Sequence, residues 1–323
     1  MRTAYAVARE ALPAYACKWS RHDFTLPQLF ACLAAKELLR RSYRGAEAVL
    51  ADSPDWLADV GLSRAPDHNT LWRAASFLLR ACRVKRVLDE IARRAVAART
   101  VGLSRKPLAV DSTSFESRHV SRHYERRCRK TAAADKATPA GGGGTGRIRA
   151  GKRAKRARRT RSATVKRLPK LGIAVAAASH LILAAWVGTG GGSDHPHFEP
   201  VVAAARGRVP NRSFTVAADA GYDSEAHHEL CRRDMGLVTL IPPDIGRPRK
   251  DGGPPGGKWR ARMTRVMATK ESRKRSGYTQ RWQAETVNSM MKRNLGSALA
   301  GKSAWSRRRD MLLKVLTHNI MLL

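Results

Sequence analysis

Three acidic residues stand where the surrounding sequence predicts that they act together. Asp111 and Asp219 each end an apolar run, LAVD and FTVAAD, so that each carboxylate would close a buried strand. Glu285 lies in residues 278–292, YTQRWQAETVNSMMK, which lack Gly and Pro and predict a helix that begins after Gly277. Hard divalent cations prefer carboxylate oxygens, and two such ions about 3.5–4 Å apart activate a hydroxyl and stabilise the leaving oxygen of a phosphodiester. The three acids therefore indicate metal-assisted phosphodiester chemistry, provided that the fold brings them together.

The predicted helix carries further polar groups on the face that holds its acid. Side chains at offsets 0, 3, 7 and 14 fall within a sector of roughly 60° at about 100° per residue. These side chains are Tyr278, Arg281, Glu285 and Lys292. The two cations suit DNA phosphates, and Trp282, beside Arg281, is the one tryptophan of the seven that we place near DNA. The simpler alternative is a solvated face with an Arg281–Glu285 pair four residues apart.

The charge of the whole chain favours a polyanionic partner. Its 323 residues contain 62 Lys and Arg against 26 Asp and Glu, a formal net charge of +36. Such a field repels itself unless a polyanion or counterions neutralise it, so nucleic acid is the expected partner, and we expect no membrane partner. Five scattered cysteines without C-x-x-C spacing favour a reducing cytosol.

The elements that must position the acids read as a mixed α/β sheet. Residues 171–188 predict two apolar strands joined at Ser179-His180, which favours strands over the alternative of a membrane span. After the strand that ends at Asp219, the helical text SEAHHELCRRD and the strand LVTLI predict a right-handed crossover and hence a parallel pair. The closing segment WSRRRDMLLKVLTHNIMLL predicts an amphipathic helix with one apolar face on the core. The order is ribonuclease-H-like, and in such sheets chemistry gathers at strand ends.

The chain divides into two predicted domains. Residues 1–100 predict a helical N-terminal domain, in which Asp67 can cap a helix beginning near Leu71. With the preceding helix about a dozen residues upstream, this has the outline of a helix-turn-helix that contacts DNA. Residues 101–323 would form the catalytic domain. It is interrupted at about 131–165 by a basic Gly-, Ala- and Arg-rich insertion that cannot bury a core and that we expect to be a disordered loop.

One motif carries a resemblance to a known family. The spacing Tyr278-x2-Arg281-x3-Glu285-x6-Lys292 resembles the signature of insertion-sequence DDE transposases at every position. AVDST around Asp111 and ADAGYDS around Asp219 are similar to the first and second catalytic blocks of that family. The similarity extends from FTLPQLFACLAAKELLRRSYRGAEAVLADSP through DHNTLWRA and SDHPHFEP to THNIMLL, most of the chain from residue 24 onward.

The resemblance implies a ribonuclease-H-like catalytic domain that binds Mg²⁺, with Mn²⁺ as a substitute and two ions expected, through Asp111, Asp219 and Glu285. Such an enzyme cuts the ends of a transposon and joins the freed 3′-hydroxyl to target DNA. Its partner is double-stranded DNA, both the terminal repeats and the target. Synapsis of two ends implies a homodimer or a higher oligomer. The basic insertion departs from the compact first hairpin that the family predicts.

Three other functions are alternatives to an active transposase. The first is a catalytically inactive transposase remnant that acts as a DNA-binding repressor, and the second is a basic RNA-binding or structural protein whose acids are surface residues. A zinc hydrolase is the third, suggested by the histidines near Asp194, but their spacing matches no common ligand pattern. Those histidines are His195, His197, His227 and His228.

Overall fold

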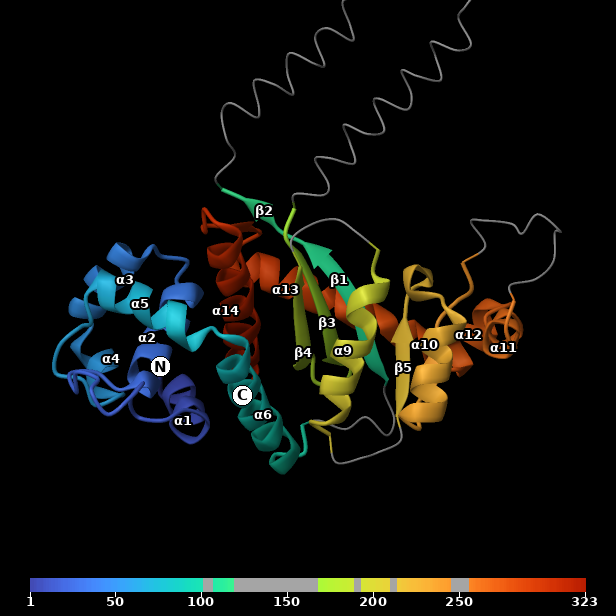
Figure 1. Ribbon diagram of the computed structural model, residues 1–323, viewed down its shortest axis with the longest axis horizontal. Coiled ribbons are helices and arrows are strands. Elements are labelled where there is room, and N and C mark those ends of the chain that lie inside the picture. The colour runs from blue at the N-terminus through green and yellow to red at the C-terminus, as the bar shows by residue number, and fades with distance from the viewer. Residues whose placement is uncertain (101–106, 119–167, 189–192, 210–213, 245–255) are drawn as a thin grey trace, which may run out of the picture.

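A five-stranded mixed sheet organises the computed structural model, which describes residues 1–100, 107–118, 168–188, 193–209, 214–244 and 256–323. The strands lie in the order β4-β3-β1-β5-β6 (Figure 1). β1 and β4 run antiparallel to β3, whereas β1, β5 and β6 run parallel to one another. The strands are β1 Leu108–Ser114, β3 Lys170–Ala176, β4 Ile182–Gly188, β5 Thr215–Ala218 and β6 Val238–Leu240. This topology confirms the predicted α/β fold with ribonuclease-H-like strand order.

The apolar text of residues 171–188 forms the β3–β4 hairpin, as predicted. Every residue of β3 is buried, and His180 reverses the chain with a φ of 62°. The run is apolar because the hairpin lies inside the protein, between helices on both sides of the sheet. Within the described residues, the longest apolar helices still fall short of what a membrane crossing requires.

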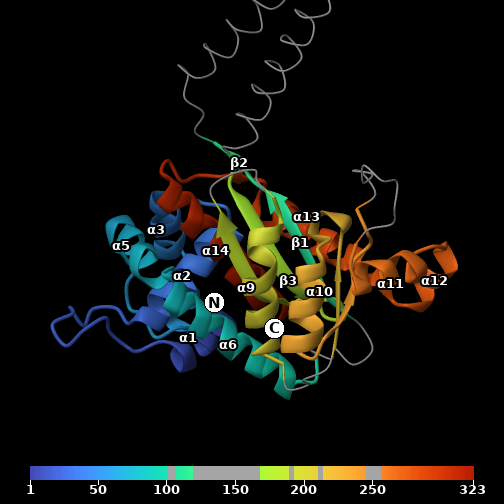
Figure 2. The same ribbon diagram turned by 45° about the vertical axis from the view of Figure 1, so that its right-hand side comes forward.

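Helices cover both faces of the sheet (Figures 1 and 2). α9 (His195–Arg206) packs on β3 and β4, and α13 (Trp282–Leu295) packs on β1 and β3 from the other face. Gly172 of β3 permits the close approach of α9, because a Cβ there would lie 2.4 Å from the ring of His197. α10 (Glu225–Glu229) and the π-helical turn η2 (Leu230–Asp234) form the crossover from β5 to β6.

α14 (Ala304–Leu322) departs from the amphipathic helix that the sequence predicts. All of residues 311–319 are buried, including Lys314, His318 and Asn319. The reason is its position, since it packs against β4 on one side and against α2 and α6 on the other. Asn319 bonds the backbone of Ile182 in β4 through both its Oδ1 (2.9 Å) and its Nδ2 (2.8 Å). A helix enclosed by two layers needs no solvent face.

The N-terminal hundred residues are helical, as predicted. Asp67 caps α5 by accepting hydrogen bonds from the backbone N–H groups of Asn69 and Thr70 at 2.9 and 3.0 Å. One buried apolar cluster runs from these helices through α14 into the sheet, so the described chain shares a continuous core. The division at residue 100 stays a prediction. The helices are α1 Arg2–Ala11, α2 Leu26–Leu38, α3 Tyr43–Ala51, α4 Pro54–Ala58, α5 His68–Leu78 and α6 Ala81–Ala97.

The segment predicted as one helix over residues 278–292 consists of two parts. It begins as the 3-10 turn η3 (Tyr278–Arg281) and becomes the α-helix α13 only at Trp282. Gly277 reverses the chain before it with a φ of 81°, and Tyr278 turns inward against a small cluster that contains Met263 and Met267. The single α-helix predicted over the four motif residues was therefore wrong in its first turn, although three residues per turn still bring Tyr278 beside Arg281. The predicted basic insertion at 131–165 lies outside the described residues.

Candidate active site

Asp111 and Asp219 occupy equivalent positions on neighbouring parallel strands. Val110 of β1 pairs with Ala218 of β5, so the next residue on each strand is an aspartate. Asp219 follows the last residue of its strand, as predicted, and its carboxylate accepts a hydrogen bond from the Gly221 N–H at 2.9 Å. Asp111 does not end its strand, because β1 continues to Ser114 by pairing with β3. The parallel pairing of β1 with β5 stops just before the two aspartates, whereas the antiparallel pairing of β1 with β3 continues past Asp111.

The surroundings of the two aspartates disfavour two negative charges. Burial raises the pKa of Asp111 to about 6, and the carboxylates of Asp219 and Glu285 push it in the same direction. Burial likewise raises the pKa of Asp219, with Asp194 and Glu285 adding repulsion. A cation placed between them would relieve this repulsion, and the donor set is all oxygen, which suits a hard divalent ion.

Glu285 belongs to the same electrostatic environment but is held by an arginine. It lies in the first turn of α13, its side chain is 56% exposed, and its Oε1 accepts from Arg281 at 2.5 Å. Arg281 also lowers the pKa of both aspartates. In the part of the chain that the structure describes, no three His, Cys, Asp or Glu side chains lie close enough to hold a metal ion. Glu285 would have to exchange Arg281 for a cation to complete a three-carboxylate site.

Asn288 joins the helix of Glu285 to Asp111. It lies one turn after Glu285 and is 7% exposed, and its Nδ2 donates to Asp111 Oδ2 at 3.0 Å. Its Oδ1 is buried and, within the described residues, has no hydrogen-bond partner. Sequence reasoning missed this residue, although its position three residues after the motif glutamate places it on the same helix face.

The other residues predicted to contact DNA have different surroundings. Trp282 is 53% exposed beside Arg281, as a DNA contact requires. Lys292 lies farther along α13, with its Nζ 5.5 Å from the centre of the Phe115 ring. Tyr278 is half-buried, and burial raises the pKa of its hydroxyl. Tyr278 nonetheless lies close to the acids, because Asp219 raises and Arg281 lowers the pKa of its hydroxyl.

A polar network lies behind the aspartates on the α9 face of the sheet. Asp194 accepts from the Ser112 hydroxyl at 2.7 Å and forms an ion pair with Lys170. His197 contacts the Tyr222 hydroxyl at 2.8 Å, and burial lowers the pKa of this histidine to about 4. The His197 side chain therefore holds Tyr222, three residues after Asp219, in place. Of the other histidines that suggested a zinc site, His227 stacks on Phe198 and His228 contacts the Thr239 hydroxyl at 2.6 Å, and no group of three possible metal ligands occurs in the described residues.

Comparison with known proteins places the chain in a family. A family model described as a transposase DDE domain matches residues 102–320, which is more than half of the chain. The chain belongs to this family. A search of the curated proteins found no match, and neither did a search of the solved structures.

The matched region includes all three predicted acids. DDE transposases cut and transfer DNA and in general use divalent metal ions. The match spans β1, β5 and α13, the three elements that carry the acids of this transposase domain. Which side chains hold the metal stays a prediction.

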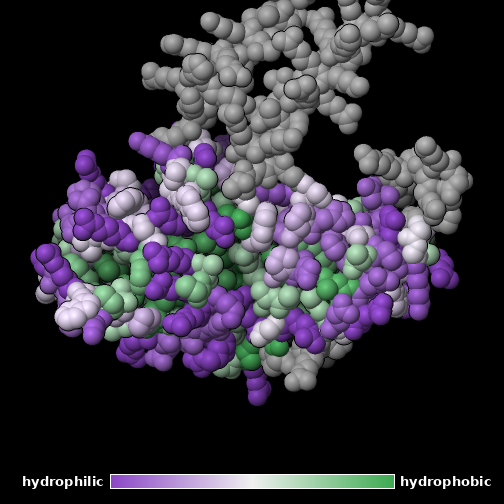
Figure 3. Space-filling model, viewed as in Figure 1, coloured by the Kyte–Doolittle hydropathy of each residue, from purple (hydrophilic) through white to green (hydrophobic). Residues whose placement is uncertain are grey.

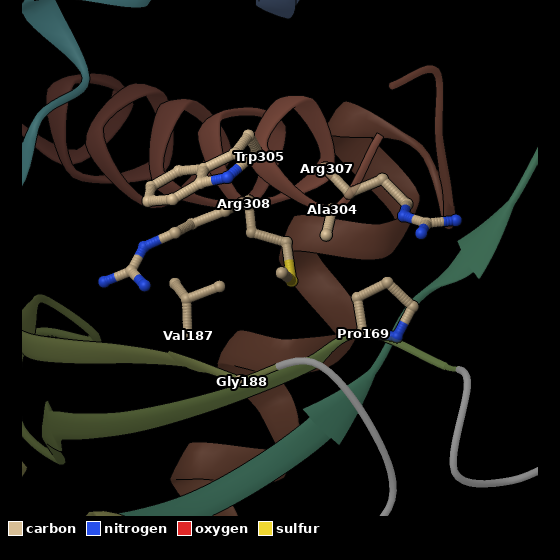
Figure 4. Close-up of a pocket in the computed structure, with 8 residues that line it drawn as sticks. Pro169, Val187, Gly188, Ala304, Trp305, Arg307 and Arg308 are labelled. Carbon is tan, nitrogen blue, oxygen red and sulfur yellow. The ribbon is translucent and has the colours of Figure 1, made fainter. Parts of the chain in front are cut away.

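A separate recess in the transposase domain was not predicted. It has a volume of about 240 Å³ and lies between the end of β4 and the start of α14 (Figure 4). Trp305, 75% exposed, stands over its apolar floor. None of the three acids lines it. The lining residues are Pro169, Val187, Gly188, Ala304, Trp305, Arg307, Arg308 and Met311.

Proposed function

We propose that this chain is the active transposase of an insertion sequence and that Asp111, Asp219 and Glu285 bind two Mg²⁺ ions, for which Mn²⁺ can substitute. The observation that carries the proposal is the position of the two aspartates, side by side at the edge where the parallel pairing of β1 and β5 stops. Their raised pKa values indicate a site that is short of positive charge.

The ions would supply activation of the attacking hydroxyl and stabilisation of the leaving oxygen. In the first step, water attacks a phosphorus at the end of the element, the bond to the 3′-oxygen breaks, and that oxygen takes a proton to become a free hydroxyl. In the second step, this hydroxyl loses its proton and attacks a phosphorus of the target, the bond from that phosphorus to the target's own 3′-oxygen breaks, and the leaving oxygen takes a proton. The residues of the chain orient the DNA for both steps.

Arg281 has two partners in this scheme. Its guanidinium holds Glu285 at 2.5 Å, and a DNA phosphate would compete for the same donors. A phosphate that engages Arg281 would free the Glu285 carboxylate for a cation. Trp282 can stack against the DNA, and Lys292 would meet the backbone farther along the helix.

End recognition is assigned to the N-terminal helices. α5 begins at the Asp67 cap and exposes Trp72 and Arg73, the side chains that a major-groove helix would present. Two ends must be held at once, so the working form would be a dimer or a higher oligomer.

The test is cleavage of labelled DNA that bears the ends flanking this gene, with Mg²⁺ or with a chelator. Glu285→Gln keeps the side-chain shape but removes a ligand charge, and we expect cleavage to fall by more than about a hundredfold, since changes outside the ligand shell alone cost 10–100-fold. Glu229→Gln, an exposed residue of the β5–β6 crossover, is the matched control and should cleave normally. Cleavage that survives in Glu285→Gln removes that residue from the site. End binding without cleavage by the unaltered protein would instead indicate a remnant that acts as a repressor.

A further inference from the structure

Along the chain, a strongly basic pair of short helices follows β6 and precedes α13, the helix of Glu285. We call α11 (Lys258–Val266) and α12 (Lys270–Arg275) together the basic arm. Seven of its cations are exposed, and its one acid is Glu271. α12 has no buried residue. The exposed cations are Lys258, Arg262, Arg265, Lys270, Arg273, Lys274 and Arg275.

The underside of the arm is fixed to the catalytic domain. Glu225 of α10 accepts from the first backbone N–H groups of α11, those of Trp259 and Arg260, at 2.9 and 3.0 Å. Arg260 also pairs with the fully buried carboxylate of Asp223 at 2.5 Å. Met263 and Met267 are buried against strands β5 and β6. The outer side of the arm is thereby presented at a defined place and not on a free loop.

The cations of α11 form a regular stripe. Lys258, Arg262 and Arg265 are spaced by four and three residues, so they lie on one face and extend over about 10 Å at 1.5 Å per residue. None of them has a carboxylate partner in the described chain. Like charges at this spacing repel one another. Lys258 and Arg262 also lie 5.0 and 6.0 Å from the centre of the Trp259 ring, and a polyanion on this face would reverse the repulsion.

The arm is continuous with the active site. α12 leads through Gly277 into η3, whose Tyr278 packs on the same cluster as Met263 and Met267, and then into the helix of Glu285. Figures 1 and 2 place the arm at the opposite end of the molecule from the N-terminal helices. This end is mostly hydrophilic in Figure 3. DNA held at the acids and extending away from the N-terminal helices would pass over it.

We propose that the basic arm binds the phosphate backbone of duplex DNA beside the scissile bond, without reading its bases. The inference rests on the proposed function for its substrate class and adds the surface that carries the DNA past the acids. Lysines and arginines are the main side-chain donors to phosphate oxygens, and the attraction between their charge and the backbone acts on every sequence alike.

The experiment compares two triple variants of equal charge. Lys258→Gln, Arg262→Gln and Arg265→Gln neutralise the stripe, and Lys302→Gln, Arg118→Gln and Arg308→Gln neutralise three exposed cations outside both the arm and the N-terminal helices. Binding of a short random-sequence duplex is measured by fluorescence anisotropy over a range of salt concentrations, with a chelator present. The stripe variant should lose about 2–3 units of salt slope, about 0.9 for each phosphate contact, and bind about 10–100-fold more weakly near 0.1 M salt.

The remote triple should keep most of the slope, and the charge-conserving pair Arg262→Lys and Arg265→Lys should keep all of it. An unchanged slope in the stripe variant, or equal losses in both triples, would overturn the proposal and make the arm a solvated face. All substitutions are exposed, so thermal unfolding should be nearly unchanged, which separates lost binding from lost folding.

Binding without metal does not depend on catalysis, so the two proposals fail separately. If the unaltered protein binds through the stripe but never cleaves the element ends, the proposed enzyme fails and the DNA surface stands. If it cleaves and the stripe variant binds normally, only the basic arm is wrong.

Discussion

The Asn288–Asp111 bond is the one side-chain hydrogen bond that joins α13 to β1 among the described residues. An amide donor favours the ionised carboxylate, which opposes the rise in pKa that burial causes at Asp111. The same bond fixes the orientation of the carboxylate, and it leaves the Asn288 Oδ1 free of other partners in the described chain. In the proposed metal site, Asn288 would therefore be a positioning residue for Asp111.

Asn288→Ala should weaken divalent-cation binding by about 10–100-fold, the usual cost of losing a group that orients a metal ligand. The measurement is the rise in thermal unfolding midpoint on titration with Mg²⁺ or Mn²⁺, together with the Mg²⁺ concentration for half-maximal cleavage. Asn294→Ala, an exposed residue of the same helix, is the control and should titrate as the unaltered protein. Equal titrations for all three proteins would limit Asn288 to a packing role.

At the scale of secondary-structure elements, the start of η3 and α13 depends on one reversal of the backbone. Gly277 adopts a φ of 81°, directs Tyr278 inward, and lets η3 continue into α13. An L-residue with a Cβ is disfavoured in this left-handed region. A Cβ at Gly277 would meet no atom within 4 Å, so the only penalty for a side chain there is the backbone conformation.

Gly277→Ala should therefore lower the free energy of unfolding by about 1–2 kcal/mol. Gly45→Ala is the matched comparison, because Gly45 lies inside α3 with a helical conformation and only ordinary contacts around its missing Cβ. That change should raise stability by about 0.5–1 kcal/mol. Urea denaturation measures both. A neutral Gly277→Ala would show that the turn accepts another conformation.

At the scale of the whole molecule, α14 joins the N-terminal helices to the sheet through a buried ion pair. Lys314 donates to Glu37 of α2 at 2.7 Å and to the carbonyl of Leu295 at the end of α13 at 2.5 Å. Arg40 bonds the carbonyl of Asn294 at 2.9 Å. α2 and α13 therefore meet in a polar network, of which the Lys314–Glu37 pair is buried and the Arg40–Asn294 bond is exposed.

Lys314→Met should cost about 3–5 kcal/mol, because it leaves the buried Glu37 without its main partner. The double variant Lys314→Met, Glu37→Gln removes both charges and should lose less, since the remaining amide can still accept from Lys36, now 3.3 Å from Glu37. Denaturant unfolding followed by tryptophan fluorescence measures these losses. A single transition is expected from the continuous core, and two separated transitions would contradict that expectation.

The amino-acid sequence by itself determined the strand order, the helical character of the first hundred residues and the family, because apolar periodicity and motif spacing are local properties. It also placed the acids on β1, after β5 and on the helix that packs beside them. Only the tertiary structure decided the enclosure of α14, the inward turn of Tyr278, the Arg281–Glu285 pair beside the aspartates and the Asn288–Asp111 bond. These depend on contacts between residues far apart in the chain, such as Asn288 and Asp111, whose distance is set by how the layers pack and not by any neighbouring residue.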